Sequence, residues 1–115
     1  METIFQKIIR KEIPADIVYE DDEVMAFYDI HPIAPVHVLI IPKKPIESIA
    51  HLEEADGPLV GKMFLVARSV ARDLNISEKG YKLLIRTGSD GGQEIPHLHV
   101  HLLGGGPLTE NIHLV

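Results

Sequence analysis

Apolar and polar residues alternate along this chain in short blocks, and one block has helical spacing. Its apolar residues recur every three or four positions within residues 58–74: Leu59, Met63, Val66, Ala67, Val70 and Leu74. Polar side chains occupy other positions, as on a helix with one buried face. Pro58 stands near the start, where a missing N–H costs little. The spacing predicts a long amphipathic helix over residues 58–74.

Five shorter blocks have the length and composition of strands. They are residues 17–20, 24–28, 37–41, 81–86 and 97–103. Asp21-Asp22 is a turn signal, so the first two blocks predict a hairpin. Residues 37–41 form a nearly continuous apolar run, which favours a central strand covered on both faces. Two prolines exclude regular structure over residues 29–35.

Short helical signals complete the pattern. Thr3 and Gln6 have the spacing of a capping box, which predicts a short helix that ends before Pro14. Residues 46–52 suggest another brief helix. Strands outnumber helices and short turns join them, so we expect an α+β fold. The sheet should be mainly antiparallel and five-stranded, with one long and one or two short helices in a single domain over residues 1–115.

Composition narrows the function classes. Eleven Lys and Arg against seventeen Asp and Glu give a formal charge of −6, which disfavours broad nucleic-acid binding but not a small phosphate ligand. There is no cysteine, so disulfides and thiol catalysis are excluded. The apolar blocks are too short to span a bilayer, and charges interrupt the N-terminal ten residues. We therefore expect a soluble cytoplasmic protein without membrane association.

Three of the seven histidines lie within five residues, at His97, His99 and His101. In a strand, alternate side chains share a face, so all three imidazoles should project together. The opposite face should turn three apolar side chains toward the core: Leu98, Val100 and Leu102.

The histidine cluster allows three interpretations. The first is an ordinary polar strand face, although Lys, Thr or Glu fill such faces more often than His. The second is a zinc site, since H-x-H is a common half-site and His37 or Glu94 can supply a third ligand. The third is acid/base or nucleophilic catalysis, because imidazole titrates near working pH and is a good nucleophile there.

The surroundings of the cluster favour an anion. Residues 88–93 are rich in glycine, and such a loop can turn backbone N–H groups inward as an anion-binding concavity. A wide turn is the plainer interpretation of the loop by itself. His37 begins another strand and can lie beside the cluster. Asp29 either accepts a bond in an Asx turn or binds a diol. Five apolar residues fit either a core or a slot for a flat base: Ile4, Phe5, Ile8, Phe27 and Ile30.

At this point the chain resembles a known family. His97-Leu-His-Val-His-Leu-Leu103 fits the histidine triad pattern in full. Further matching segments run across most of the chain: residues 3–15, Ala26-Phe-Tyr-Asp-Ile30, Pro32-Ile-Ala-Pro-Val-His37, Ile41-Pro-Lys-Lys44 and Gly91-Gly-Gln-Glu94. Together these motifs resemble the HINT branch of the histidine triad (HIT) superfamily, whose members are purine nucleoside phosphoramidases.

The resemblance implies a HIT fold in which two subunits join into one continuous sheet, so a homodimer is expected. It implies hydrolysis of adenosine or guanosine 5′-phosphoramidates to an amine and AMP or GMP, with no cofactor required. His99 matches the middle triad histidine, which attacks the α-phosphorus and forms a nucleotidyl-histidine. Water then releases the nucleoside monophosphate.

The resemblance also assigns the remaining site residues. His101 would contact the phosphate and assist proton transfer, and His97 and His37 would hold the hydrogen-bond relay. Asp29 would bind the ribose hydroxyls, and the backbone around residues 92–94 would bind the phosphate. The base slot and phosphate segment would comprise Ile4, Phe5, Ile8, Phe27, Ile30, Gly92, Gln93 and Glu94.

Some positions depart from the family pattern. Arg86 stands where many relatives have an asparagine that touches substrate, and it can grip phosphate, clash with it or point away. Glu94 replaces a serine of some relatives, and the tail, residues 107–115, has no tryptophan, so amine specificity is not transferred. Three alternatives stay open: a dinucleoside polyphosphate hydrolase or nucleotidyl transferase, a nucleotide sensor with little turnover, and a zinc protein.

Overall fold

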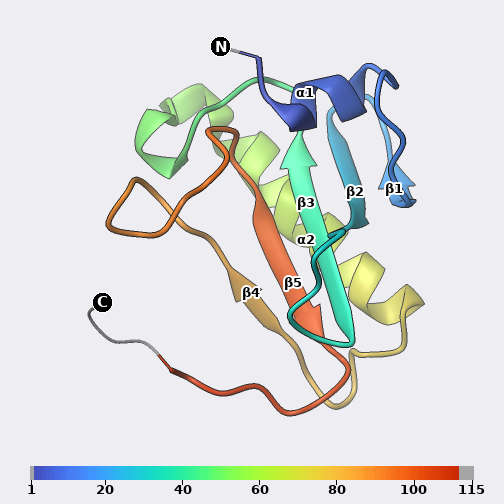
Figure 1. The fold of residues 1–115 in the computed structure, drawn as a ribbon. Helices are drawn as coiled ribbons and strands as arrows, with labels where there is room; N and C mark the ends of the chain where they lie inside the picture. The colour runs from blue at the N-terminus through green and yellow to red at the C-terminus, as the bar shows by residue number, and fades with distance from the viewer. Residues whose placement is uncertain (1, 112–115) are drawn as a thin grey trace.

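The computed structural model describes residues 2–111. The main helices are α1 (Ile4–Ile9) and α2 (Gly57–Asp73). Two short 3₁₀ turns, η1 (Ile49–His51) and η2 (Glu54–Asp56), come just before α2 in the chain. The strands are β1 (Ile17–Glu20), β2 (Val24–Tyr28), β3 (Val36–Pro42), β4 (Lys82–Leu84) and β5 (Val100–Gly104). Figure 1 shows their arrangement.

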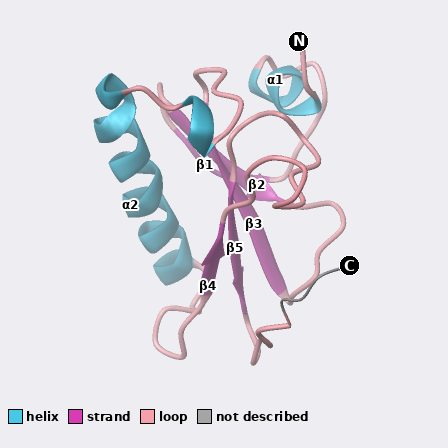
Figure 2. Ribbon diagram, turned by 90° about the vertical axis from the view of Figure 1, so that its left-hand side faces the viewer, coloured by secondary structure: helices cyan, strands magenta, loops and turns pink. Residues whose placement is uncertain are grey.

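The five strands form one sheet in the order β1-β2-β3-β5-β4, and every neighbouring pair is antiparallel. This confirms the α+β class and the five-stranded antiparallel sheet. The helix α2 covers one face, while α1 and several loops lie on the other (Figure 2). The strand β3 is central, as its continuous apolar run predicts.

Local sequence signals account for both helices. The Gln6 N–H donates to Thr3 Oγ1 at 3.3 Å and the Thr3 N–H donates to Gln6 Oε1 at 2.8 Å, which completes the expected capping box. Pro58 lies in the first turn of α2, where its missing N–H leaves no helical bond unmade. The helix buries Met63, Val66 and Val70 against the sheet, as the apolar spacing predicts.

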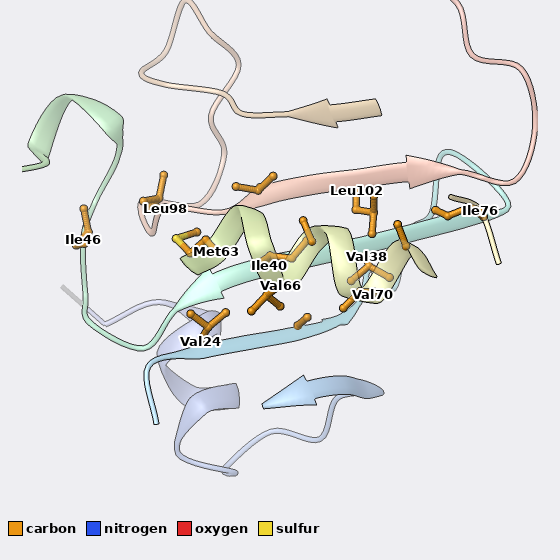
Figure 3. Close-up of a cluster of buried hydrophobic side chains, with 14 residues drawn as sticks. Val24, Val38, Ile40, Ile46, Met63, Val66, Val70, Ile76, Leu98 and Leu102 are labelled. Carbon is orange, nitrogen blue, oxygen red and sulfur yellow. The ribbon is translucent and has the colours of Figure 1, made fainter. Parts of the chain in front are cut away.

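The main core lies between α2 and the sheet (Figure 3). Alternate residues of β3 and β5 enter it, so Val38 and Ile40 meet Val100 and Leu102 beneath the helix. Leu98 also belongs to this core. The predicted division of residues 97–102 into an imidazole side and an apolar side is therefore confirmed.

Two strands are shorter than the sequence predicts. The expected strand over residues 97–103 starts only at Val100, because the Leu98 N–H donates instead to Ile46 O at 2.7 Å. The expected strand over residues 81–86 is reduced to Lys82–Leu84, since pairing ends where Leu84 meets His101. The brief helix expected over residues 46–52 is the 3₁₀ turn at Ile49–His51. Within residues 2–111, no helix is both long and apolar enough to cross a membrane.

Candidate active site

The two strands at the centre of the sheet bring two histidines together on the face opposite α2. In the β3–β5 register, His37 pairs with Leu103 and Leu39 pairs with His101, so the two histidines are diagonal neighbours on the same face. Their rings meet, with His37 Nε2 2.9 Å from His101 Nδ1. The expectation that His37 lies beside the cluster is confirmed.

His97 is fixed by the backbone of a neighbouring strand. Its Nε2 lies 2.8 Å from the carbonyl oxygen of Pro42, which can only accept, so Nε2 carries the proton. The side chain is 1% exposed, and its Nδ1 has no hydrogen-bond partner among residues 2–111. Nothing in the sequence signals the Pro42 carbonyl as a partner, because backbone pairing across 55 positions depends on the fold.

His99 is held in one tautomer by the same segment. Its Nδ1 lies 2.6 Å from the carbonyl oxygen of His97, so Nδ1 donates and Nε2 keeps its lone pair. Phe5 stands edge-on to the ring, with centroids 5.1 Å apart. A neutral imidazole with a lone pair on a fixed Nε2 has the form that nucleophilic attack requires.

Burial keeps the four histidines neutral. It is the leading cause that lowers the pKa of His37, His97 and His99 below the ordinary value of 6.5. Burial likewise lowers the pKa of His101 to about 4, with further lowering by His99 and by the Arg86 charge. At neutral pH the rings therefore act as bases and relays rather than as cations.

Asp29 follows β2 and faces the histidines. Its Oδ1 accepts a hydrogen bond from the His31 N–H at 2.8 Å, the Asx-turn contact allowed by the sequence. Its Oδ2 lies 3.4 Å from His37 Nε2. The carboxylate is thus anchored on one side and turned toward the cluster on the other.

Arg86 enters the cluster from beyond the end of β4. Its Nη1 lies 3.2 Å from His101 Nε2, which resolves the open question about its direction: the side chain points toward the histidines. The glycine-rich loop covers it, since a Cβ on Gly92 would lie 3.5 Å from Arg86 Cδ. Gly92 also has a φ of +80°, a backbone conformation that residues with a Cβ rarely adopt.

Gln93 holds the loop in place through its side chain. The Gly88 N–H donates to Oε1 at 3.0 Å, and Nε2 donates to Glu47 O at 2.7 Å and Ile95 O at 3.0 Å. The loop therefore lies beside the segment leading into η1 (Figure 1). The exposed Glu94 lines a cavity of about 370 Å³ with Glu47 and neighbouring residues. The sequence indicated that the loop is important, but it contained no signal for these hydrogen bonds of the Gln93 side chain.

The five residues expected for a base slot divide into two groups. Phe5, Ile8 and Phe27 belong to a second buried cluster, on the α1 side of the sheet. Ile4 and Ile30 are exposed, with Ile30 at 80%. The structure thus brings Phe5 against His99 and leaves Ile30 on the surface, next in sequence to Asp29.

One set of side chains has the composition of a metal site. The nearest ligand atoms of Asp29, His37 and His101 all lie within 4.8 Å of one another. This differs from the H-x-H half-site considered from the sequence, because only one triad histidine takes part. His37 and His101 already contact each other, and the Arg86 guanidinium adjoins the set.

Comparison with known proteins identifies the family of the chain. The model of the HIT domain family matches residues 10–108. The purine nucleoside phosphoramidase of Escherichia coli K12 is 51% identical over 107 residues, covering 93% of this chain and 90% of that protein. A HIT family hydrolase from Legionella pneumophila has a TM-score of 0.93 at 44% identity, covering 96% of this chain and 98% of the other.

A histidine triad protein from Clostridium difficile is equally similar in fold, with a TM-score of 0.93 at 39% identity over 97% of both chains. The chain belongs to the HIT domain family, and it is a hydrolase of that family. The resemblance to the HINT branch is confirmed by the match to the E. coli phosphoramidase.

Proposed function

We propose that this protein hydrolyses the P–N bond of adenosine or guanosine 5′-phosphoramidates. The observation that carries the proposal is the tautomer of His99, whose Nδ1–H is held by the His97 carbonyl at 2.6 Å while Nε2 keeps its lone pair. The E. coli relative, named a purine nucleoside phosphoramidase, supports the choice of substrate class.

In the first step, His99 Nε2 attacks the α-phosphorus and a P–Nε2 bond forms as the bond to the amine nitrogen breaks. The amine nitrogen leaves with the bonding electron pair and takes up a proton from His101, which in this proposal is neutral in the free site and gains that proton from solvent when the anionic substrate binds. The 2.9 Å contact between His37 and His101 supports this role, because a proton lost by His101 can be replaced through His37.

In the second step, a water oxygen attacks the phosphorus of the nucleotidyl-histidine. The P–Nε2 bond breaks, the pair returns to His99 and AMP or GMP is released. The water loses one proton, which His101 takes back. Two steps of moderate height thus replace one difficult displacement, and fixed donors around the phosphoryl oxygens stabilise the shifting charge.

Nucleotide binding extends from the same cluster. The Asp29 carboxylate, turned toward His37, would accept hydrogen bonds from the ribose hydroxyls. The backbone around residues 92–94 would bind the phosphate, since Gln93 uses its side chain to hold the loop. The base would contact the buried residues Phe5, Ile8 and Phe27 on the α1 side together with the exposed Ile4 and Ile30.

The proposal includes no required metal. A direct contact between His37 and His101 and a guanidinium beside them support a proton relay rather than a cation site. The catalytic unit would be a homodimer in which the sheet continues into a second copy. Two observations support a subunit interface at this edge of the sheet. The strand β4 is an edge strand with an exposed Leu83, and α2 exposes Phe64 and Leu65. A cytoplasmic location stays a prediction.

The test is release of a fluorescent amine from an adenosine 5′-phosphoramidate. Wild type, His99→Ala and His51→Ala are compared with and without a chelator, and His51 serves as the control because it is an exposed histidine outside the cluster. We expect release by wild type and His51→Ala, none by His99→Ala, and no effect of chelator.

Each other outcome points to an alternative. Loss of activity on addition of the chelator would favour the interpretation of the histidine cluster as a metal site. An inert wild type that still binds AMP would favour a nucleotide sensor. Faster cleavage of a dinucleoside polyphosphate than of the phosphoramidate would favour that hydrolase class.

A further inference from the structure

Arg86 is a cation at the histidine cluster without an acidic partner. Among the described residues, no carboxylate oxygen lies within 4 Å of its guanidinium. Within residues 2–111, its one side-chain hydrogen-bond contact is His101 Nε2 at 3.2 Å. A half-buried guanidinium with free donors is a natural receptor for an anion.

The positions of the ring protons on His37 and His101 also indicate a missing acceptor beside Arg86. The Ile33 N–H donates to His37 Nδ1 at 3.2 Å, so a neutral His37 carries its proton on Nε2. That proton is donated to His101 Nδ1 at 2.9 Å, which places the proton of a neutral His101 on Nε2. The Nε2–H of His101 then faces the N–H of Arg86, and two donors meet at 3.2 Å.

The opposite assignment does not remove the conflict. If His101 Nε2 accepts from Arg86, its proton lies on Nδ1 and faces the Nε2–H of His37 at 2.9 Å. Donation of the His37 Nε2–H to Asp29 Oδ2, 3.4 Å away, still leaves the Nδ1–H of His101 facing a nitrogen that has no lone pair. A further proton on either ring would add a donor, and burial opposes that charge. Two neutral rings between two fixed donors leave one donor without an acceptor.

We propose that Arg86 and His101 form a two-donor clamp for an anionic phosphoryl oxygen, and that Arg86 makes the site selective for the charge of the phosphate. An oxygen between Arg86 Nη1 and His101 Nε2 accepts from both groups and resolves the donor conflict. The proposal rests on the proposed function for the identity of the nucleotide. It adds a specificity-determining residue that carries a permanent charge where many relatives have a neutral asparagine.

The clamp has a consequence for ligand preference. A terminal phosphate monoester carries about two negative charges at pH 7, since its second pKa is near 6. The product AMP therefore carries more negative charge than the phosphoramidate substrate, in which the amine nitrogen replaces one ionisable phosphate oxygen. Arg86 should bind AMP more tightly for that reason. Product inhibition and affinity for AMP should both depend on this one side chain.

The experiment measures the Kd of AMP, adenosine and inorganic phosphate by calorimetry for wild type, Arg86→Asn and Arg86→Lys. Lys82→Asn is the matched control, because it removes a positive charge from the same side of the sheet edge while Lys82 contacts Thr109 O and Glu110. We expect Arg86→Asn to weaken AMP binding about 10- to 100-fold, as for loss of a charged hydrogen bond. Adenosine binding should not change.

Two further readouts separate a clamp from a structural role. Wild-type affinity for AMP should fall with added salt more steeply than that of Arg86→Asn, because a charge pair is screened. Arg86→Lys should retain part of the affinity, which excludes simple misfolding. AMP binding by Arg86→Asn that is equal to or tighter than that of wild type would overturn the proposal, as would an equal loss in Lys82→Asn.

Failure of the proposed function is distinguishable. If wild type neither hydrolyses the phosphoramidate nor binds adenosine, yet binds inorganic phosphate and loses it in Arg86→Asn, the clamp stands and the nucleotide assignment is wrong. If AMP and adenosine bind but phosphate charge and Arg86 make no difference, the nucleotide assignment stands and the clamp is wrong.

Discussion

The two faces of the sheet are built from the same strands but hold different side chains. Beneath α2, the residues from β3 and β5 are aliphatic, such as Ile40 and Leu102, and both are fully buried. On the other face, alternate positions of the same strands carry His37 and His101, which are nearly as buried, at 3% and 7% exposed. The period of two along a strand thus separates a core from a reactive site within one layer.

The difference lies in how each face satisfies burial. The α2 face removes apolar surface from water, which needs no particular partner for any atom. The histidine face holds buried polar atoms that need partners, and it pairs rings with carbonyl oxygens and with each other, although His97 Nδ1 has no partner among residues 2–111. The first arrangement stabilises the fold, whereas the second fixes tautomers. Substitutions on the two faces should therefore affect different quantities.

The largest effect is expected for His99→Ala on the histidine face. The kcat for amine release should fall at least about 1,000-fold, because the proposed nucleophile is removed. The melting temperature should fall less than in Leu102→Ala, since the Nδ1 bond of His99 is made to its own segment at His97 and the main packing lost is that against Phe5. Steady-state assay and calorimetry on one preparation measure both. Retention of more than a tenth of wild-type kcat would contradict the assignment.

Leu102→Ala should have the reverse effect on the α2 face. Leu102 is fully buried, so truncation should lower the free energy of unfolding by about 2–5 kcal/mol through lost burial and an added cavity. At low temperature, where the variant remains folded, kcat should stay within a few-fold of wild type. Urea denaturation gives the stability. A loss of kcat as large as that of His99→Ala would mean that the two faces are not separable.

Acid should weaken the histidine face through its titration. The folded-state pKa of His101 lies at about 4, below the ordinary 6.5 of an unfolded chain, so the stability is full above pH 6.5 and is lost as pH falls toward 4. Each pKa unit corresponds to about 1.4 kcal/mol, so His101 accounts for a loss on the order of 3 kcal/mol over that range.

Denaturation between pH 7 and pH 5 separates the titration of the buried histidines from that of salt-bridged carboxylates such as Asp56, whose lowered pKa places it in more acidic solution. His101→Gln should have a shallower dependence of stability on pH in this window. An unfolding free energy that is independent of pH, or that rises on acidification, would contradict neutral burial of the rings.

Asp29→Asn should produce the smallest change. Asparagine keeps an oxygen for the His31 N–H but lacks the carboxylate that we propose binds the ribose. The KM should rise about 10-fold while kcat stays nearly constant, as for lost binding that is uniform along the reaction. Asp22→Asn, at an exposed turn position, is the matched control. A fall in kcat without a change in KM would place Asp29 in the chemistry instead.

The sequence predicted the fold well where a local pattern decides it. The capping box at Thr3, the long helix and the alternation across His97–His101 all depend on near neighbours or on simple periodicity. The sequence predicted β4 and β5 to be longer than they are, because the point where each strand ends depends on a distant hydrogen-bond partner. Ile46 accepts the Leu98 N–H, so pairing cannot extend through His99.

The site was predictable in its members but not in its contacts. The spacing of the histidines and the motif at residues 32–37 identified the cluster. The bonds from His97 to the Pro42 carbonyl and from Gln93 to the Glu47 carbonyl, however, join segments that only the fold brings together. The direction of Arg86 was open for the same reason. Whether its guanidinium points inward depends on where β4 ends and on how the loop at Gly92 covers it.

The most direct test of the account is detection of the covalent intermediate. Wild type and His101→Gln are mixed with an adenosine 5′-phosphoramidate, quenched in alkali within milliseconds to seconds and analysed by intact mass and peptide mapping. The account predicts a mass increase of one adenylyl group on the peptide that contains His99, longer-lived in His101→Gln because water attack is slowed. Amine release at the normal rate with no adduct, or an adduct that persists in His99→Ala, would contradict it.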